Sequence, residues 1–236
     1  MRGFSSACRA LFDVMLPPRC LLCGRPCGKD DEALCPDCIA DLPPPATPHC
    51  PLCLIATTYG ERCGACQRQP PHFDAARALY RYDFPLDRLI HLLKYRAGFA
   101  LAKTWGRQLA ALTADLPVDL ILPLPLHPER LGERGYNQAL EIARSLARAR
   151  GLPCDRESLV KTRATPPQTS LDMKARKKNL RGAFECRRDF SGQTLLLVDD
   201  VLTTGATADE AARTLKLHGA ARVYLAVVAR TGHQVG

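Results

Sequence analysis

The sequence predicts an α/β protein with a mainly parallel sheet, preceded by a small cysteine-rich module. From about residue 72 onward, apolar runs of strand length alternate with segments of helical periodicity. Before residue 70, eight cysteines stand in four C-x-x-C pairs. Later, the apolar run Leu195–Val198 leads directly into Asp199 and Asp200 and a short threonine-rich loop. Together these observations indicate a metal module first and a parallel sheet second.

The chain has 236 residues, enough for one sizeable α/β domain and a small module. Its 33 Lys and Arg against 24 Asp and Glu give a net charge of +9, which suits phosphorylated ligands or nucleic acid. The charge alone is no nucleic-acid signature, because exposed Lys and Arg also keep proteins soluble. No stretch is apolar for long enough to span a bilayer, so no membrane span is expected.

The N-terminal segment 1–18 is expected to form a short amphipathic helix, with Leu11 and Met15 on its apolar face. Arg9 and Asp13 interrupt the apolar stretch, which argues against a secretory signal. We therefore expect a cytoplasmic, reducing location. Twelve cysteines in such a location point to metal rather than to disulfides.

The segment 19–70 is expected to form a double zinc ribbon. Zinc prefers four tetrahedral thiolates, and each C-x-x-C turn places two of them on one ion. The eight ligands of two Cys₄ sites are then Cys20, Cys23, Cys35, Cys38, Cys50, Cys53, Cys63 and Cys66. Sequential pairing is the simplest arrangement, and the spacing leaves an interleaved one open. Such sites are closed to water, so the expected role is structural, with Cys27 as a spare thiol.

Turn residues accompany the cysteine pairs. Gly24 follows the first pair directly, where it permits the tight turn that aims backbone N–H groups at sulfur. Leu54 follows the third pair, where zinc knuckles usually have glycine. That departure weakens the turn argument for the second site without removing a ligand. Pro43–Pro45 separates the two ribbons, and Pro70–Pro71 marks the expected boundary with the next domain.

The second domain is expected to cover residues 71–236. Its predicted strands lie at 78–82, 118–123, 193–198 and 222–228. Its predicted helices lie at 86–93, 101–112, 136–150 and 207–218. Gly151 is the predicted stop of the third of these helices.

The predicted strand at 193–198 ends at the two acids, at the carboxyl edge where open α/β sheets bind ligands. An anion can be held there by backbone N–H groups and hydroxyls of Thr203, Thr204, Gly205, Ala206 and Thr207. An ordinary strand, turn and capped helix is the alternative, but adjacent acids at a buried strand end are costly without a partner. The stretch resembles the motif by which type I phosphoribosyltransferases bind PRPP, 5-phosphoribosyl 1-pyrophosphate. The resemblance implies that Asp199 and Asp200 bind the ribose hydroxyls, that the loop binds the 5-phosphate, and that Mg²⁺ accompanies PRPP.

Further segments resemble the ComF family: 89–95, 123–138, 163–168, 175–179 and 181–184. With the cysteine pairs and the threonine-rich loop, this resemblance covers nearly the whole chain. It implies a double zinc ribbon followed by a type I phosphoribosyltransferase-like domain. It also implies a role in DNA uptake during natural transformation, or in the use of DNA as a nutrient, acting on internalised single-stranded DNA.

Polar residues of these segments are candidates for the pyrophosphate end of the ligand, which needs cations and amides around it. They are Lys94, Arg130, Arg134, Asn137 and Arg163. Capping of a helix C-terminus is an equal alternative for Lys94. Arg134 and Asn137 are favoured as functional because Gly135 permits close backbone approach.

Two functions follow. The first is a ComF-like protein that binds PRPP with Mg²⁺ and acts on internalised single-stranded DNA, with phosphoribosyl transfer left open and DNA-uptake or recombination proteins as partners. Tyr80, Tyr82 or Tyr95 would offer stacking faces for bases, although packing is the commoner role of tyrosine. The second is a PRPP-dependent phosphoribosyltransferase of nucleotide salvage with no DNA role. No residue set indicates the acceptor, and no catalytic residue is identified.

Overall fold

The structure is a computed structural model that describes residues 19–27, 33–95, 98–163 and 180–232. The predicted helix at 1–18, the family-like segment 175–179 and all of segment 163–168 except Arg163 lie outside these residues. Within the described ranges, no helix is both long and apolar enough to cross a membrane.

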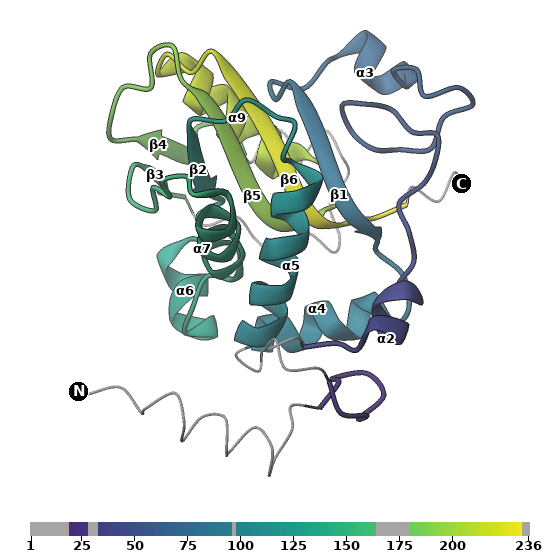
Figure 1. Cartoon of the computed structure of the whole chain (residues 1–236). Helices are drawn as coiled ribbons and strands as arrows, with labels where there is room; N and C mark the ends of the chain where they lie inside the picture. The colour runs from purple at the N-terminus through teal and green to yellow at the C-terminus, as the bar shows by residue number, and fades with distance from the viewer. Residues whose placement is uncertain (1–18, 28–32, 96–97, 164–179, 233–236) are drawn as a thin grey trace, which may run out of the picture.

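A four-stranded parallel sheet forms the centre of the molecule (Figure 1). Its strands, in spatial order, are β1 (Ala75–Arg81), β6 (Arg222–Arg230), β5 (Thr194–Leu202) and β2 (Leu120–Pro123). The apolar run Leu195–Val198 is fully buried, as expected for a strand covered on both faces. The predicted α/β class with a parallel sheet is therefore confirmed.

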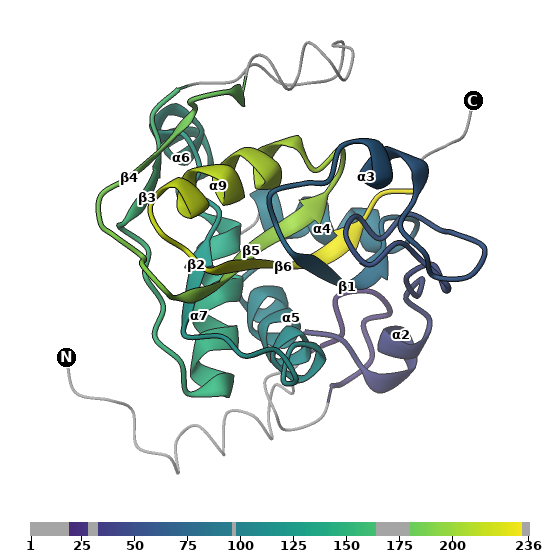
Figure 2. The ribbon, with the colours of Figure 1, turned by 90° about the horizontal axis from the view of Figure 1, so that it is seen from above.

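Helices cover both faces of the sheet: α5 and α7 pack on one side and α9 on the other (Figure 2). The helices are α2 (Pro36–Ala40), α3 (Gly64–Arg68), α4 (Leu86–Tyr95), α5 (Phe99–Leu112), α6 (Pro128–Arg134), α7 (Gln138–Arg150) and α9 (Ala206–Leu217). Two short strands, β3 (Leu159–Lys161) and β4 (Phe184–Cys186), form a separate antiparallel pair.

Close packing of α5 on α7 depends on Gly106. A Cβ atom at this position would lie 2.4 Å from the Cβ of Ser145 and 2.7 Å from the carbonyl oxygen of Ile142. Gly151 ends α7 in the left-handed conformation, with φ 65°, which confirms the predicted stop.

Apart from shifts of element ends, the structure differs from the expected elements in three main places. The predicted helix 136–150 begins only at Gln138, and the separate helix α6 precedes it. The β3–β4 pair was not predicted. The strand predicted to end at Val198 continues to Leu202, because β6 pairs with it through that residue. Asp199 and Asp200 therefore lie within β5, beyond the point where its other neighbour, β2, ends.

The two cysteine-rich segments pack on different parts of the sheet domain. The segment with α2 contributes Cys20, Leu34 and Cys35 to the apolar cluster that α4 and α5 build on one face of the sheet. The segment with α3 lies beside β1 (Figure 1), where the N–H of Ala76 donates to the carbonyl of Pro51 at 3.3 Å.

Candidate functional site

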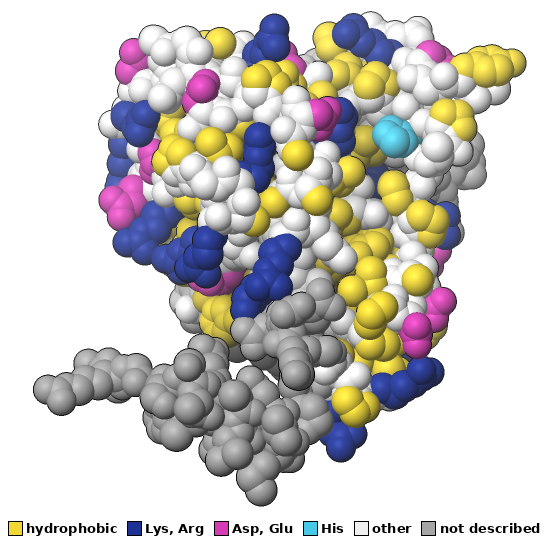
Figure 3. All heavy atoms as spheres, in the orientation of Figure 1, with side chains coloured by type: hydrophobic (Ala, Val, Ile, Leu, Met, Phe, Trp, Pro, Cys, Tyr) yellow, Lys and Arg dark blue, Asp and Glu magenta, His cyan; other side chains and the backbone are white. Residues whose placement is uncertain are grey.

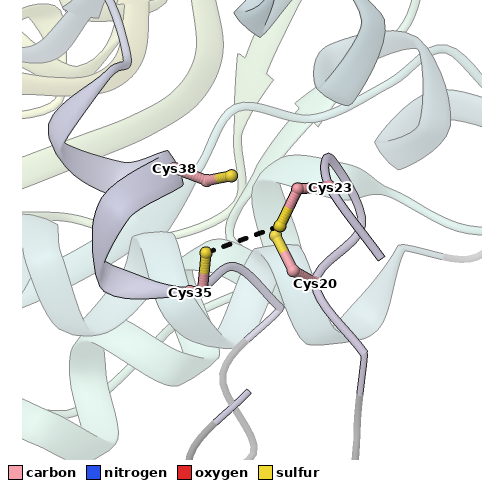
Figure 4. Close-up of side chains that lie close together, drawn as sticks. All are labelled: Cys20, Cys23, Cys35 and Cys38. Carbon is pink, nitrogen blue, oxygen red and sulfur yellow. Dashed lines mark hydrogen bonds between the residues drawn. The ribbon is translucent and has the colours of Figure 1, made fainter. Parts of the chain in front are cut away.

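Two groups of four cysteine sulfurs lie in the N-terminal segment, and within each group all sulfurs are within 4.8 Å of one another. Figure 4 shows the first group, Cys20, Cys23, Cys35 and Cys38. The second is Cys50, Cys53, Cys63 and Cys66. The pairs are thus combined sequentially, and the interleaved arrangement is excluded.

Each group fits a zinc ion. A ZnS₄ tetrahedron with Zn–S bonds of about 2.3 Å requires sulfurs about 3.8 Å apart. The Sγ atoms of Cys23 and Cys35 are 3.7 Å apart, and those of Cys53 and Cys63 are 3.5 Å apart. Four thiolates leave no coordination position for a substrate, so these ions would stabilise the fold rather than take part in chemistry.

Backbone turns favour the thiolate form of one sulfur in each group, whereas burial raises the pKa of Cys38, Cys53 and Cys66. Burial alone would raise the pKa of Cys20, but N–H groups of Cys23 and Cys35 outweigh it and lower the pKa to about 6. Corresponding donors lower the pKa of Cys50 to about 7 against the same effect of burial. Cys27 lies outside both groups, and burial together with the nearby thiolates raises its pKa to about 11. This agrees with its interpretation as a spare thiol.

The two knuckles have the same turn with different residues. The N–H of Gly24 donates to the carbonyl of Cys20, and the N–H of Leu54 donates to that of Cys50, both at 2.9 Å. Both turn residues are left-handed, with φ 71° for Gly24 and φ 62° for Leu54. Leucine is strained there, but its side chain is only 4% exposed and joins the apolar cluster under α9. Burial therefore offsets the strain that a glycine would avoid.

The acid pair lies on β5 at the carboxyl edge of the sheet. Burial, followed by the neighbouring carboxylate of Asp200, raises the pKa of Asp199 well above its usual value. Lys94, at the end of α4, places its ammonium 3.1 Å from Asp200. One cation thus faces two adjacent, half-buried carboxylates, an arrangement that fits a further cation such as Mg²⁺ or the hydroxyl donors of a ribose.

The loop after β5 leads into α9. Gly205, with φ 79°, is the N-cap of this 12-residue helix, so the N–H groups of its first turn are open to an anion. The hydroxyl of Thr204 accepts from the N–H of Ala206 at 3.4 Å. The predicted phosphate loop therefore has the strand–loop–helix setting that its resemblance requires.

The residues predicted for the pyrophosphate end of the ligand have different surroundings in the structure. Lys94 is brought to the acids, as described. Both polar atoms of the Asn137 amide bind backbone, accepting from Ala139 N–H at 3.0 Å and donating to the Leu124 carbonyl at 3.1 Å. Arg134 donates to Gln138 at 3.2 Å, and Arg163 donates to the carbonyl of Arg181 at 3.4 Å.

A pocket of about 640 Å³ lies between α6, the start of α7 and β3. Its apolar lining includes Leu126, Leu131, Leu140, Leu159 and Val160. Lys161 also lines it. Burial and then Arg130 lower the pKa of this lysine, whereas the charge of Asp199 raises it. Sequence reasoning found no such pocket, because its walls come from three separate segments.

Arg230, at the end of β6, was also missed. It is only 5% exposed and donates to the carbonyls of Leu202 and Thr203 at 3.0 and 2.6 Å. The sequence shows an arginine at the end of an apolar strand, but it does not show which hydrogen-bond acceptors this arginine binds.

Comparison with known proteins agrees with this two-part architecture. A double zinc ribbon domain matches residues 11–67, and a phosphoribosyl transferase domain matches residues 134–236. The chain is 33% identical to DNA utilization protein YhgH of Escherichia coli K12, over 92% of this chain and 99% of the relative. It is 30% identical to Competence protein F of Haemophilus influenzae, over 90% of this chain and 96% of the relative.

The chain belongs to the ComF family. The predicted family membership, the double zinc ribbon and the type I phosphoribosyltransferase-like fold are confirmed. Among solved structures, the ComF-family chain resembles APRTase from Giardia lamblia complexed with 9-deazaadenine, with 21% identity and a TM-score of 0.39 over 60% of this chain and 72% of that chain.

Proposed function

We propose that this ComF-family protein binds PRPP with Mg²⁺ and acts in the cytoplasm on single-stranded DNA during DNA uptake or utilisation. The observation that carries the proposal is the placement of Lys94, Asp199, Asp200 and the Gly205-capped helix at one edge of the parallel sheet. The names of the relatives, DNA utilization protein and Competence protein F, favour the DNA role.

Each part of this edge has a task in holding PRPP. Asp199 and Asp200 accept hydrogen bonds from the ribose hydroxyls, and the N–H groups and hydroxyls of Thr203–Thr207 hold the 5-phosphate. Lys94 supplies positive charge beside the acids. Mg²⁺ would neutralise the pyrophosphate group when bound. The protein thereby orients the sugar and excludes water from its reactive carbon.

Ligand binding is tested by thermal unfolding. PRPP with Mg²⁺ at about one hundred times its Kd should stabilise the fold by about 2.7 kcal/mol, which raises Tm by about 5 °C or more. The double variant Asp199→Asn, Asp200→Asn should lose this shift. Asp115→Asn is the matched control, since its carboxylate is 67% exposed and pairs with Arg77. A parent protein without any shift would contradict PRPP binding.

The DNA surface is proposed to lie over α5 and α7. Figure 3 shows Lys and Arg side chains gathered there, and the two helices are in direct contact, with the Ser145 hydroxyl donating to the Lys103 carbonyl at 2.8 Å. The basic residues on these helices are Lys103, Arg107, Arg144, Arg148 and Arg150. Arg144 pairs with Glu141 at 2.7 Å and Arg150 donates to the Leu116 carbonyl at 3.0 Å, so the exposed Arg107 and Arg148 are the main candidates for phosphate contacts. A cationic strip of this kind tracks a phosphate backbone without reading bases. Tyr80, by contrast, is buried and donates to Gln108 at 2.9 Å, as a packing residue does.

A salt titration locates this surface. Arg107→Ala with Arg148→Ala should remove two phosphate contacts and reduce the slope of log K against log salt by about 1.4 for single-stranded DNA. Arg62→Ala with Arg68→Ala removes two exposed arginines of the second ribbon and is the matched control. A larger loss in this control would move the DNA surface to the ribbons.

The pocket between α6, α7 and β3 favours a second function, phosphoribosyl transfer to an acceptor with an apolar, planar part. Val160→Trp should fill it and abolish acceptor-dependent pyrophosphate release from PRPP, while the PRPP-induced Tm shift remains. Leu217→Trp, at an exposed position outside the pocket lining, is the control. Equal release by both variants would place the acceptor elsewhere.

A further inference from the structure

Arg230 lies between the second cysteine group and the phosphate loop. Its Nε donates to the carbonyl oxygen of Cys53 at 2.7 Å. Its Nη1 donates to the carbonyls of Leu202 at 3.0 Å and Thr203 at 2.6 Å. Thr231 adds its carbonyl and hydroxyl oxygens, at 2.6 and 3.0 Å from the same nitrogen. One guanidinium thus joins a zinc knuckle to the backbone that opens the loop.

Burying a guanidinium is costly unless its donors and its charge are both satisfied. The carbonyls of Cys53, Leu202 and Thr203 satisfy donors, and a zinc ion with four thiolates carries a net charge of −2 next to the arginine. Because the Nε of Arg230 binds the carbonyl of Cys53, itself a ligand of the second site, a zinc ion bound there by four thiolates would be the counter-charge of Arg230.

The planar shape of the Arg230 guanidinium, with its forked N–H donors, matters as much as its charge. The Nε and Nη1 atoms of one planar group bind chain segments on two sides, which a single ammonium cannot do. The N–H of Thr231 also donates to the Leu202 carbonyl, at 3.1 Å, so this carbonyl is held from two directions. The start of the phosphate loop is thus fixed by β6 and the knuckle together.

We propose that Arg230 is a positioning residue that couples the second zinc site, Cys50–Cys66, to the phosphate-binding loop. With this site loaded, Arg230 holds the Leu202–Thr203 backbone so that the N–H groups of the first turn of α9 face an anion. Loss of the ion loosens the knuckle and with it the loop. Coupling between two sites is reciprocal, so a phosphate bound in the loop should in turn retain the ion. This inference rests on the proposed function for its ligand and on the contacts of Arg230 for its path.

The first experiment needs no ligand. Amide hydrogen exchange of the peptide covering residues 202–209, in which the N–H of Asp209 donates to the Gly205 carbonyl at 2.8 Å, is compared in the parent, Cys63→Ser, Arg230→Lys and Tyr59→Ala. Cys63→Ser empties the second site, and Arg230→Lys keeps the charge but loses the fork. Both should speed exchange by about tenfold, within the range usual for coupled sites. Tyr59→Ala, 88% exposed on the same ribbon, should leave it unchanged. Parent-like exchange in Arg230→Lys overturns the coupling, because charge compensation would then suffice.

The second experiment uses the parent protein, so it holds even if a variant fails to fold. A zinc chelator and iodoacetamide are added with or without ribose 5-phosphate, and peptide mass spectrometry follows alkylation of Cys63 and Cys23. Ribose 5-phosphate should slow alkylation of Cys63 by about tenfold and leave Cys23, in the first site, unchanged. In Arg230→Lys the protection of Cys63 should disappear. Protection of both sites alike, or of neither, overturns the proposal.

The two hypotheses fail differently. If ribose 5-phosphate binds, as a Tm shift shows, and Cys63 is not protected, the coupling is wrong and the ligand site stands. If neither ribose 5-phosphate nor PRPP with Mg²⁺ shifts Tm, the proposed ligand is wrong, and the exchange experiment alone decides the coupling.

Discussion

The two zinc knuckles have the same four-cysteine ligand set and the same turn, yet they contact different parts of the sheet domain. The first inserts Cys20 and Cys35 into the large apolar cluster below α5, and the N–H of Ala33 donates to the Thr104 hydroxyl at 3.2 Å. The second keeps Cys50 and Cys66 in a small cluster of their own. Its links to the sheet domain include Leu54 and Arg230. The first knuckle is therefore anchored in the main core, and the second is connected through Arg230 to the backbone before the threonine-rich loop.

The largest expected difference follows from removing one ligand of each site. Cys20→Ser should leave the chain largely unfolded, because it removes zinc binding worth about 10 kcal/mol, comparable with the stability of a domain, from a knuckle that is part of the main apolar cluster. Cys63→Ser should keep the sheet domain folded with one zinc per chain. Circular dichroism with elemental analysis compares them. Equal unfolding of the two variants would break the distinction between the two knuckles.

Substitutions of the turn residues should change the stability of the two knuckles by an intermediate amount. Leu54→Gly should cost about 1–4 kcal/mol, the loss of a buried leucine reduced by relief of its left-handed strain. Gly24→Ala should cost only about 1–2 kcal/mol, since φ is positive but a Cβ there meets no atom within 4 Å. Urea unfolding measures both. A larger loss at Gly24 would mean that the first knuckle depends more on its turn than on its packing.

A single hydrogen bond tests the attachment of the first knuckle. Thr104→Val leaves the buried N–H of Ala33 without its partner and should cost about 1–2 kcal/mol. It should speed chelator-dependent alkylation of Cys23 and leave hydrogen exchange of residues 202–209 unchanged. Faster exchange in that loop would show that the first knuckle also reaches the site.

The smallest expected change in stability comes from the acid pair, which is part of neither knuckle. The folded-state pKa of Asp199 is raised above its unfolded value, so its contribution to stability is present at low pH and is lost as pH rises through the folded pKa. Asp199→Asn should therefore raise Tm by about 2 °C at pH 7, as removal of strain at a binding site does. The gain should vanish toward pH 3. A lower Tm at neutral pH would show that the charged form is satisfied without ligand.

The sequence predicted those features that depend on residues close together along the chain. Cysteine spacing gave the ligand set, the apolar run Leu195–Val198 gave the central strand, and Gly151 marked a helix end. Helix α6 was missed because Gly132 interrupts its periodicity. The acids were placed after the strand because two adjacent carboxylates end the apolar run that marked it. Arg230 could not be predicted, since Cys53 lies 177 positions away along the chain.

Arg230 also limits how this protein can be divided. Pro70–Pro71 looks like a linker at which the ribbons could be removed to leave a minimal ligand-binding fragment. Cutting there would expose the apolar cluster that Leu54 covers and leave the Nε of a buried guanidinium without an acceptor. The fragment would retain every residue of the Asp199–Thr207 motif and lose the contact that holds its loop from the ribbon side. The change in composition at Pro70–Pro71 does not separate two independent units, because contacts cross it. Studies of ligand binding therefore need the full chain.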